Sequence, residues 1–238
     1  MSQFEVLNKE KHRNLRIKSG YGPELGDAAM YVMTFPVEFR DIQSSYPILF
    51  TKDPNTGGFF PVAVLGFERD QNLFLKDNEW DAPYVPAVVE RQPFMIATSG
   101  DGENENPVVS LDLDHPRISE QGDGEPLFGD DGEATELLNR KIALLDKLHH
   151  GLQHSNGFVT ALLEHELLEQ IGLDITFNDG EKKSLQGFYT IAEERLYKLK
   201  GDVLESLNTA GYLQPIFMAV ASLSRMRDVI ERRNRLQS

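Results

Sequence analysis

The feature of this sequence that most constrains its fold is a change in the spacing of apolar residues near the middle of the 238-residue chain. Up to about Asp114, apolar residues form short β-prone runs separated by Pro, Gly and Asn, a pattern typical of strands and turns. Later they recur at spacings of three and four, which indicates amphipathic helices. We therefore predict an α+β fold, with a first half of short, mainly antiparallel strands and a mainly helical second half that contains one small hairpin.

A strongly acidic stretch separates the two patterns. Between Gly100 and Glu133, Arg117 is the single Lys or Arg among many Asp and Glu residues, and interleaved Gly and Pro favour a solvated connector. We expect one integrated unit with three parts, namely a β-rich half (1–114), an acidic connector (115–133) and a helical half with a β-hairpin (134–238).

Strand pairs and one helical turn are predicted in the first half. Tyr46–Thr51 and Phe59–Phe67 are apolar runs on either side of dense turn residues, which predicts a hairpin. Phe94–Thr98 and Val108–Leu113 have the same character and are expected to pair. Ala87–Gln92 lies between two prolines and suits a single helical turn.

Helices dominate the predicted second half. Apolar residues at helical spacing predict one helix over 138–152, with Gly151 as its C-cap, and a second over 156–171. The sequence around Asp179 and Gly180 indicates a small hairpin.

The composition excludes several classes of protein. The formal net charge is −14, which argues against nucleic-acid binding despite the arginines near the C-terminus. The absence of Cys excludes disulfides and Cys-ligated metals. There is no stretch of roughly 20 apolar residues, so we expect no membrane insertion, and the N-terminus lacks the pattern of a signal peptide. These features predict a cytoplasmic protein.

One motif is close to a known metal site. His165–Glu169 differs by one residue from His-Glu-x-x-His, in which two His on one helical face bind zinc. A mixed site that also uses His149, His150 or His154 can be imagined. We favour the interpretation that His165 and Glu169 pair one turn apart on a helix, and we expect no metal or other cofactor.

A second motif has carboxylates at the spacing of a calcium loop. Asp101–Asn106 supplies them at positions one, three and five, but it lacks Gly at position six and has Asp112 where a bidentate Glu is needed. We interpret the segment as part of the solvated connector.

Segments along nearly the whole chain resemble the SapC family. They are Leu7–His12, Tyr46–Asp53, Thr56–Pro61, Leu65–Phe67, Asn72–Leu75, Trp80, Tyr84–Pro86, Pro93–Phe94 and Leu185–Leu196. The resemblance implies association with surface-layer proteins and with envelope-transport gene neighbourhoods, and it implies no reaction and no catalytic residues. It therefore suggests an accessory role in handling an exported surface or envelope protein, which would be the partner.

We predict that such a client protein binds an aromatic surface formed by Phe59, Phe60, Trp80 and Tyr84, because aromatic side chains dominate interfaces. Burial of the same residues in the core is the alternative. A second functional hypothesis is a cytoplasmic enzyme, metal-dependent through His and Glu residues of the helical half. The sequence identifies no catalytic residue and no oligomeric state.

Overall fold

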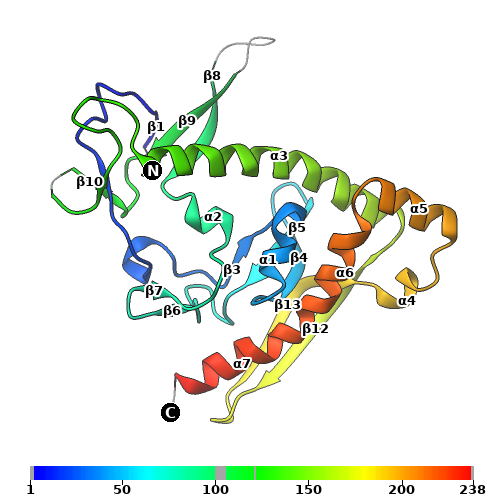
Figure 1. Cartoon of the computed structure of the whole chain (residues 1–238). Coiled ribbons are helices and arrows are strands. Elements are labelled where there is room, and N and C mark those ends of the chain that lie inside the picture. The colour runs from blue at the N-terminus through cyan, green and yellow to red at the C-terminus, as the bar shows by residue number, and fades with distance from the viewer. Residues whose placement is uncertain (1–2, 100–105, 121, 237–238) are drawn as a thin grey trace. The chain divides into compact units, whose positions relative to one another are not determined.

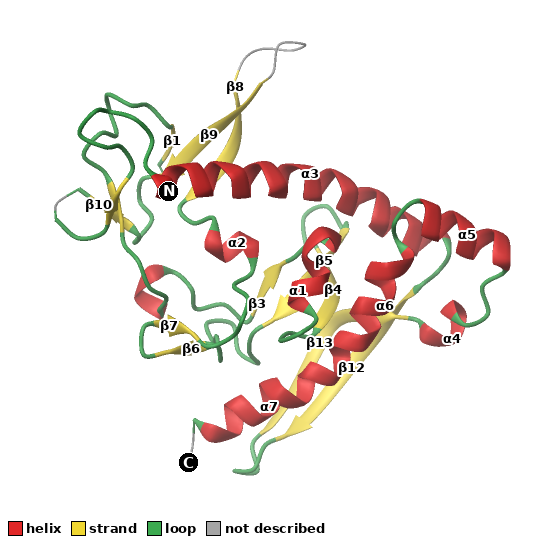
Figure 2. Ribbon diagram, in the orientation of Figure 1, coloured by secondary structure: helices red, strands yellow, loops and turns green. Residues whose placement is uncertain are grey.

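The computed structural model describes residues 3–99, 106–120 and 122–236. It combines antiparallel sheets with helices that are concentrated in the second half of the chain, so the predicted α+β class is confirmed (Figure 1, Figure 2). The chain divides into two compact units. Unit 1 is Met1–Asp27, Leu75–Trp80 and Ala87–His150, and unit 2 is Ala28–Phe74, Asp81–Pro86 and Gly151–Ser238.

Unit 1 contains three small antiparallel sheets. Their strand orders are β1-β9-β8, β10-β2-β11 and β6-β7. The strands are β1 (Phe4–Val6), β2 (Arg16–Ile17), β6 (Leu75–Lys76), β7 (Glu79–Trp80), β8 (Phe94–Ser99), β9 (Asn106–Asp112), β10 (Ile118–Ser119) and β11 (Glu125–Pro126). The short helices are the 3-10 helix η1 (Pro23–Leu25) and α2 (Ala87–Glu90).

The core of unit 1 joins its strands to the first turns of α3 (Glu136–Glu164), the long helix whose residues up to His150 belong to this unit. Its buried apolar members are Leu15, Ile17, Phe94, Leu111, Leu127, Leu137, Leu138 and Leu145. Burial of these side chains holds β2, β8 and β9 against α3.

Unit 2 is built on a five-stranded antiparallel sheet in the order β12-β13-β4-β5-β3. Its strands are β3 (Tyr31–Met33), β4 (Ile48–Lys52), β5 (Phe59–Val64), β12 (Leu168–Thr176) and β13 (Lys182–Ile191). The predicted hairpin of the first half is β4 and β5, and the predicted hairpin around Asp179 and Gly180 is β12 and β13, so both are confirmed.

Short helices complete unit 2. They are η2 (Pro36–Glu38), α1 (Phe39–Ile42), α4 (Glu193–Leu196), α5 (Gly201–Thr209), α6 (Leu213–Ser222), η4 (Leu223–Arg225) and α7 (Met226–Arg235). Aromatic packing connects the helices to the sheet, because the Phe158 ring of α3 lies 5.9 Å from the Phe39 ring and 6.3 Å from the Phe50 ring.

The prediction of two separate helices at 138–152 and 156–171 is wrong, because α3 is continuous over 29 residues. Gly151 lies inside α3 and does not cap it. A Cβ at this position would lie 3.0 Å from Cγ2 of Val37, so the glycine allows a neighbouring segment to approach the helix closely. Sequence spacing does not distinguish that packing role from a C-cap.

The second predicted helix, over 156–171, also extends too far at its C-terminal end. Glu166 has a φ of 52°, which ends the helical path, and the residues from Leu168 onward form β12. Leu168 pairs with Ile191 and Ile171 with Phe188 of β13. Pairing with a strand that lies later in the chain therefore overrides the local helical spacing of apolar residues.

Two further predictions concern the first half. The pairing of β8 with β9 and the single turn α2 are confirmed. The calcium-loop motif Asp101–Asn106 falls almost entirely outside the described residues. Among the helices that the structure describes, none is long and apolar enough to cross a bilayer.

Candidate functional site

A polar cavity of about 170 Å³ lies within unit 1. It is bordered by the segment after β2, by α2 and by the first turns of α3. Its lining is rich in charged side chains, namely Lys18, Glu90, Arg117, Glu125, Arg140 and Lys141. Buried charged side chains are usually paired with other groups. The contacts of these residues therefore show which of their charges are already engaged within the protein.

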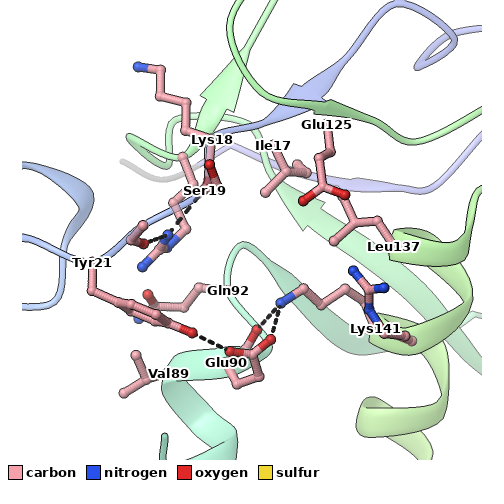
Figure 3. A pocket seen from close by; sticks show the side chains of 13 residues that line it. Ile17, Lys18, Ser19, Tyr21, Val89, Glu90, Gln92, Glu125, Leu137 and Lys141 are labelled. Carbon is pink, nitrogen blue, oxygen red and sulfur yellow. Dashed lines mark hydrogen bonds and ion pairs between the residues drawn. The ribbon is translucent and has the colours of Figure 1, made fainter. Parts of the chain in front are cut away.

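Glu90 is the centre of the hydrogen bonding on one side of the cavity. The Tyr21 hydroxyl donates to Oε2 of Glu90 over 2.5 Å, and Nζ of Lys141 donates to Oε1 over 2.8 Å. Figure 3 shows the hydroxyl and the ammonium approaching the carboxylate from opposite sides. Burial alone would raise the pKa of Glu90, but the hydrogen bonds from Lys141 and Tyr21 outweigh it and hold the pKa below its ordinary value.

Tyr21 is kept protonated by the same arrangement. Burial raises the pKa of its hydroxyl well above the ordinary value, and the hydrogen bond to Glu90 raises it further. The ring packs edge-on against Trp80 with 5.6 Å between centroids, and the Arg117 guanidinium lies 5.2 Å from the Tyr21 centroid. Tyr21 therefore remains a hydrogen-bond donor at neutral pH and cannot act as a general base there.

Arg117 is anchored from several directions. Its Nη2 bonds both carboxylate oxygens of Asp27, and its Nη1 donates to the carbonyl oxygen of Gly20 over 2.7 Å. Arg117 and Gln92, two residues of the lining, each have one fully buried atom, Nε and Oε1, without a hydrogen-bond partner within the part of the chain that the structure describes. The arrangement suits the binding of a small polar molecule.

Sequence reasoning missed this cavity because its residues come from five separate segments between Ile17 and Lys141. One signal was present. Arg117 is the single Lys or Arg in the acidic stretch Gly100–Glu133, and a lone cation among carboxylates is a candidate for a buried ion pair.

The four aromatic residues predicted to bind a client occupy different environments. Phe59 is half-buried on β5, where its ring lies 4.7 Å from the Tyr189 ring and 4.8 Å from Nζ of Lys52. Phe60 is also half-buried, and as the next strand residue it projects to the opposite face of the sheet. Phe59 and Phe60 thus retain accessible surface.

Trp80 and Tyr84 are held mainly by internal contacts. Trp80 belongs to unit 1 and is buried with 8% of its surface exposed. Tyr84 is half-buried in unit 2, where its hydroxyl donates to Oε2 of Glu38 over 2.8 Å and its carbonyl accepts from the Tyr46 hydroxyl. These contacts favour a packing role for both.

The His and Glu residues considered as metal ligands are dispersed. His149 and His150 lie inside α3, and Nδ1 of His150 is 3.6 Å from the Asp146 carboxylate. The ring of His154 lies 5.1 Å from that of Tyr212. In the described ranges of the chain, no group of three His, Asp or Glu side chains is placed to hold a metal ion.

The interpretation of His165 and Glu169 as neighbours on one helical face is wrong. The helix α3 ends at Glu164, and Glu169 lies in β12, paired with Thr190. The motif spacing assumed a continuing helix, and the strand that forms instead has a different repeat.

The outer edge of the unit 2 sheet is a second candidate for binding. β12 is its terminal strand, and β13 is its one strand neighbour among the described residues (Figure 2). In an antiparallel pair every second residue turns its N–H and C=O away from the partner strand. Of the nine residues of β12, those that turn outward therefore present a row of backbone donors and acceptors along the outer edge, with exposed Glu169 and Asp174 beside them.

These features define an α+β protein with a polar cavity in one unit and an open sheet edge in the other. The SapC family model matches residues 7–229, so the chain belongs to the SapC family. No curated protein and no solved structure matches the chain.

Proposed function

We propose that this SapC-family protein is an accessory protein that binds an exported surface or envelope protein in the cytoplasm before export. The observation that carries the proposal is the outer edge of β12, a strand of nine residues that is largely exposed. An extended client segment can add to such an edge as a further strand, with backbone hydrogen bonds supplying affinity.

The chemistry of the edge indicates the kind of segment that fits. Glu169 and Asp174 are both exposed, and like charges along an edge oppose pairing between two copies of the same strand. A client strand that carries Lys or Arg is favoured instead. Tyr189 lies on β13, the next strand, where it pairs with Gln170 of β12. Its ring packs against Phe59 of β5 and near Lys52 of β4, so an apolar contact for the same client extends inward from the edge.

The proposal is tested by affinity purification of the tagged protein from its native cells, with mass spectrometry of the proteins that accompany it. We expect an exported surface or envelope protein in stoichiometric amount. Hydrogen exchange on the purified complex should then show slower exchange at the amides of β12. An accompanying set of proteins without an exported member would contradict the accessory role.

A double charge-reversal variant tests whether the edge of β12, and not another part of the surface, binds the client. Replacing Glu169→Lys and Asp174→Lys should weaken the client complex by at least about tenfold, since it opposes a basic strand. The matched control is Asp202→Lys with Glu205→Lys on α5, which changes net charge equally and should leave affinity intact. Equal affinity in both variants would exclude β12 as the site while leaving the accessory role standing.

The alternative of a metal-dependent enzyme is not favoured by any observation in the described residues. Its candidate ligands His149, His150, His154, His165 and Glu169 do not converge there. Elemental analysis of the same purified sample tests it, because stoichiometric metal that is lost on replacing His154 or His165 would support the enzyme.

A further inference from the structure

A second cavity lies within unit 2, where residues of η2, α1, α3 and α6 meet (Figure 1). Its volume is about 220 Å³, and its apolar walls are formed by Pro36, Val37, Pro215 and Met218. None of the described residues that line it is Asp or Glu. The chain has a formal net charge of −14, so a lining without carboxylates sets this cavity apart. It can accept an anionic group because no negative charge on its walls repels one.

The Arg40 guanidinium is the cation of this cavity. Arg40 is exposed in the last turn of α1, and no ion pair or hydrogen bond engages its guanidinium within the described ranges. Its N–H donors are therefore available, and their planar fork matches a carboxylate in bidentate geometry. His154 lines the same cavity, with its ring packed 5.1 Å from the ring of Tyr212. It adds at least one further donor, because an imidazole carries an N–H in either tautomer.

The surroundings of the cavity indicate what carries the anionic group. Val37 is 45% exposed, and Phe217, which precedes Met218 on α6, is 46% exposed, so apolar surface extends outward from the walls. Gln214 lines the cavity and is exposed, and its amide offers both donors and an acceptor to a peptide group. A carboxylate, a peptide group and an apolar side chain occur together at the C-terminus of a polypeptide.

We propose that this cavity binds the free C-terminal carboxylate of a polypeptide whose last side chain is apolar. Arg40 and His154 donate to the carboxylate, and Gln214 pairs with the last peptide group. The last side chain packs against Pro215 and Met218. The volume of about 220 Å³ is several times the roughly 30 Å³ that one water molecule occupies. The inference does not rest on the accessory role or on strand addition at β12.

Fluorescence anisotropy of the full chain with short peptides, labelled at the N-terminus, tests the proposal. The peptides end in Leu, Ile, Val or Phe, each as the free acid and as the C-terminal amide. We expect at least one acid to bind with a Kd below about 1 mM and its amide to bind roughly tenfold or more weakly, since the amide loses the charge-assisted pair. Non-specific attraction to this acidic protein would favour the amide instead.

Two outcomes of the peptide experiment would show that the proposal is wrong. One is that no acid binds, or that acid and amide bind equally. The other concerns a small apolar carboxylate without a peptide group, for which sodium octanoate is the competitor. If octanoate displaces the labelled peptide at concentrations as low as the unlabelled peptide does, the cavity takes small carboxylates and not a polypeptide terminus.

Two variants locate the site. Arg40→Gln alters an exposed residue and should weaken binding of the acid roughly tenfold, so that acid and amide bind alike. The matched control Arg227→Gln, at an exposed arginine of α7, changes the net charge equally and should leave affinity intact. His154→Phe keeps a ring beside Tyr212 but removes its N–H donor, and should weaken binding several-fold. Wild-type affinity in Arg40→Gln, or an equal loss in Arg227→Gln, would overturn the assignment.

Discussion

Nη2 of Arg117 lies 2.9 and 2.7 Å from the two carboxylate oxygens of Asp27, and the exposed fractions of the two side chains are 6% and 0%. Because neither charge can be solvated once its partner is gone, Asp27→Ala should lower the free energy of unfolding by about 3–5 kcal/mol. Urea denaturation followed by circular dichroism measures the change.

A surface pair provides the control for this prediction. Glu136 and Arg140 lie 3.3 Å apart on α3 and are both exposed, so Glu136→Gln should change the free energy of unfolding by less than about 0.5 kcal/mol. Replacing the buried pair by apolar residues, as in Asp27→Leu with Arg117→Met, should recover much of the loss. An unchanged unfolding midpoint for Asp27→Ala would show that the pair is not buried in solution.

The pKa of Glu90 should make stability depend on pH. Its hydrogen bonds to Tyr21 and Lys141 hold the folded pKa below the unfolded value, so the unfolded chain binds the proton more tightly. The stabilisation is fully present above the unfolded pKa, which lies near 4.5, and is lost as pH falls through the folded pKa. Glu90→Gln should therefore destabilise the protein at pH 7 and do so much less near pH 3, as measured by urea denaturation across that range. A difference that stays constant with pH would contradict the assignment.

Gly157 shows that helix propensity is overridden in α3. A Cβ there would overlap the Tyr212 hydroxyl, so Gly157→Ala should lower the free energy of unfolding by about 1 kcal/mol through overpacking, although Ala is the better helix former. Adding Tyr212→Phe should restore stability. The control is Gly201→Ala at the start of α5, where no atom lies within 4 Å of the added Cβ. Equal unfolding midpoints for Gly157→Ala and Gly201→Ala would refute the packing explanation.

Substitutions of the aromatic residues should fall into two groups, one that lowers the free energy of unfolding and one that weakens client binding. Trp80→Ala removes a buried ring and should lower the free energy of unfolding by about 3–5 kcal/mol, with little effect on client affinity of the folded fraction. Phe59→Ala should weaken client binding while the unfolding midpoint moves far less, and Phe60→Ala tests the opposite face of the sheet. If neither Phe variant changes affinity in a client binding assay, the aromatic surface is not the binding site.

Local patterns predicted much of the fold. The turn residues between Tyr46–Thr51 and Phe59–Phe67 correctly indicated the β4–β5 hairpin, because turn chemistry acts over a few residues. The helical spacing after Leu138 correctly indicated helix in this region, but it did not show that α3 is one continuous helix. The errors occurred at Gly151 and at 168–171, where Val37 and β13 determine the outcome from distant parts of the chain.

The sequence by itself determined the α+β class, the family, the net charge and the absence of Cys, because these depend on composition and on patterns within short segments. The tertiary structure decided the rest. It buried Arg117 against Asp27, 90 residues away in the chain, and left β12 at the edge of the sheet. Ion pairs and sheet order depend on which distant segments pack together, and the free energy of that packing is shared among many side chains that no local pattern records.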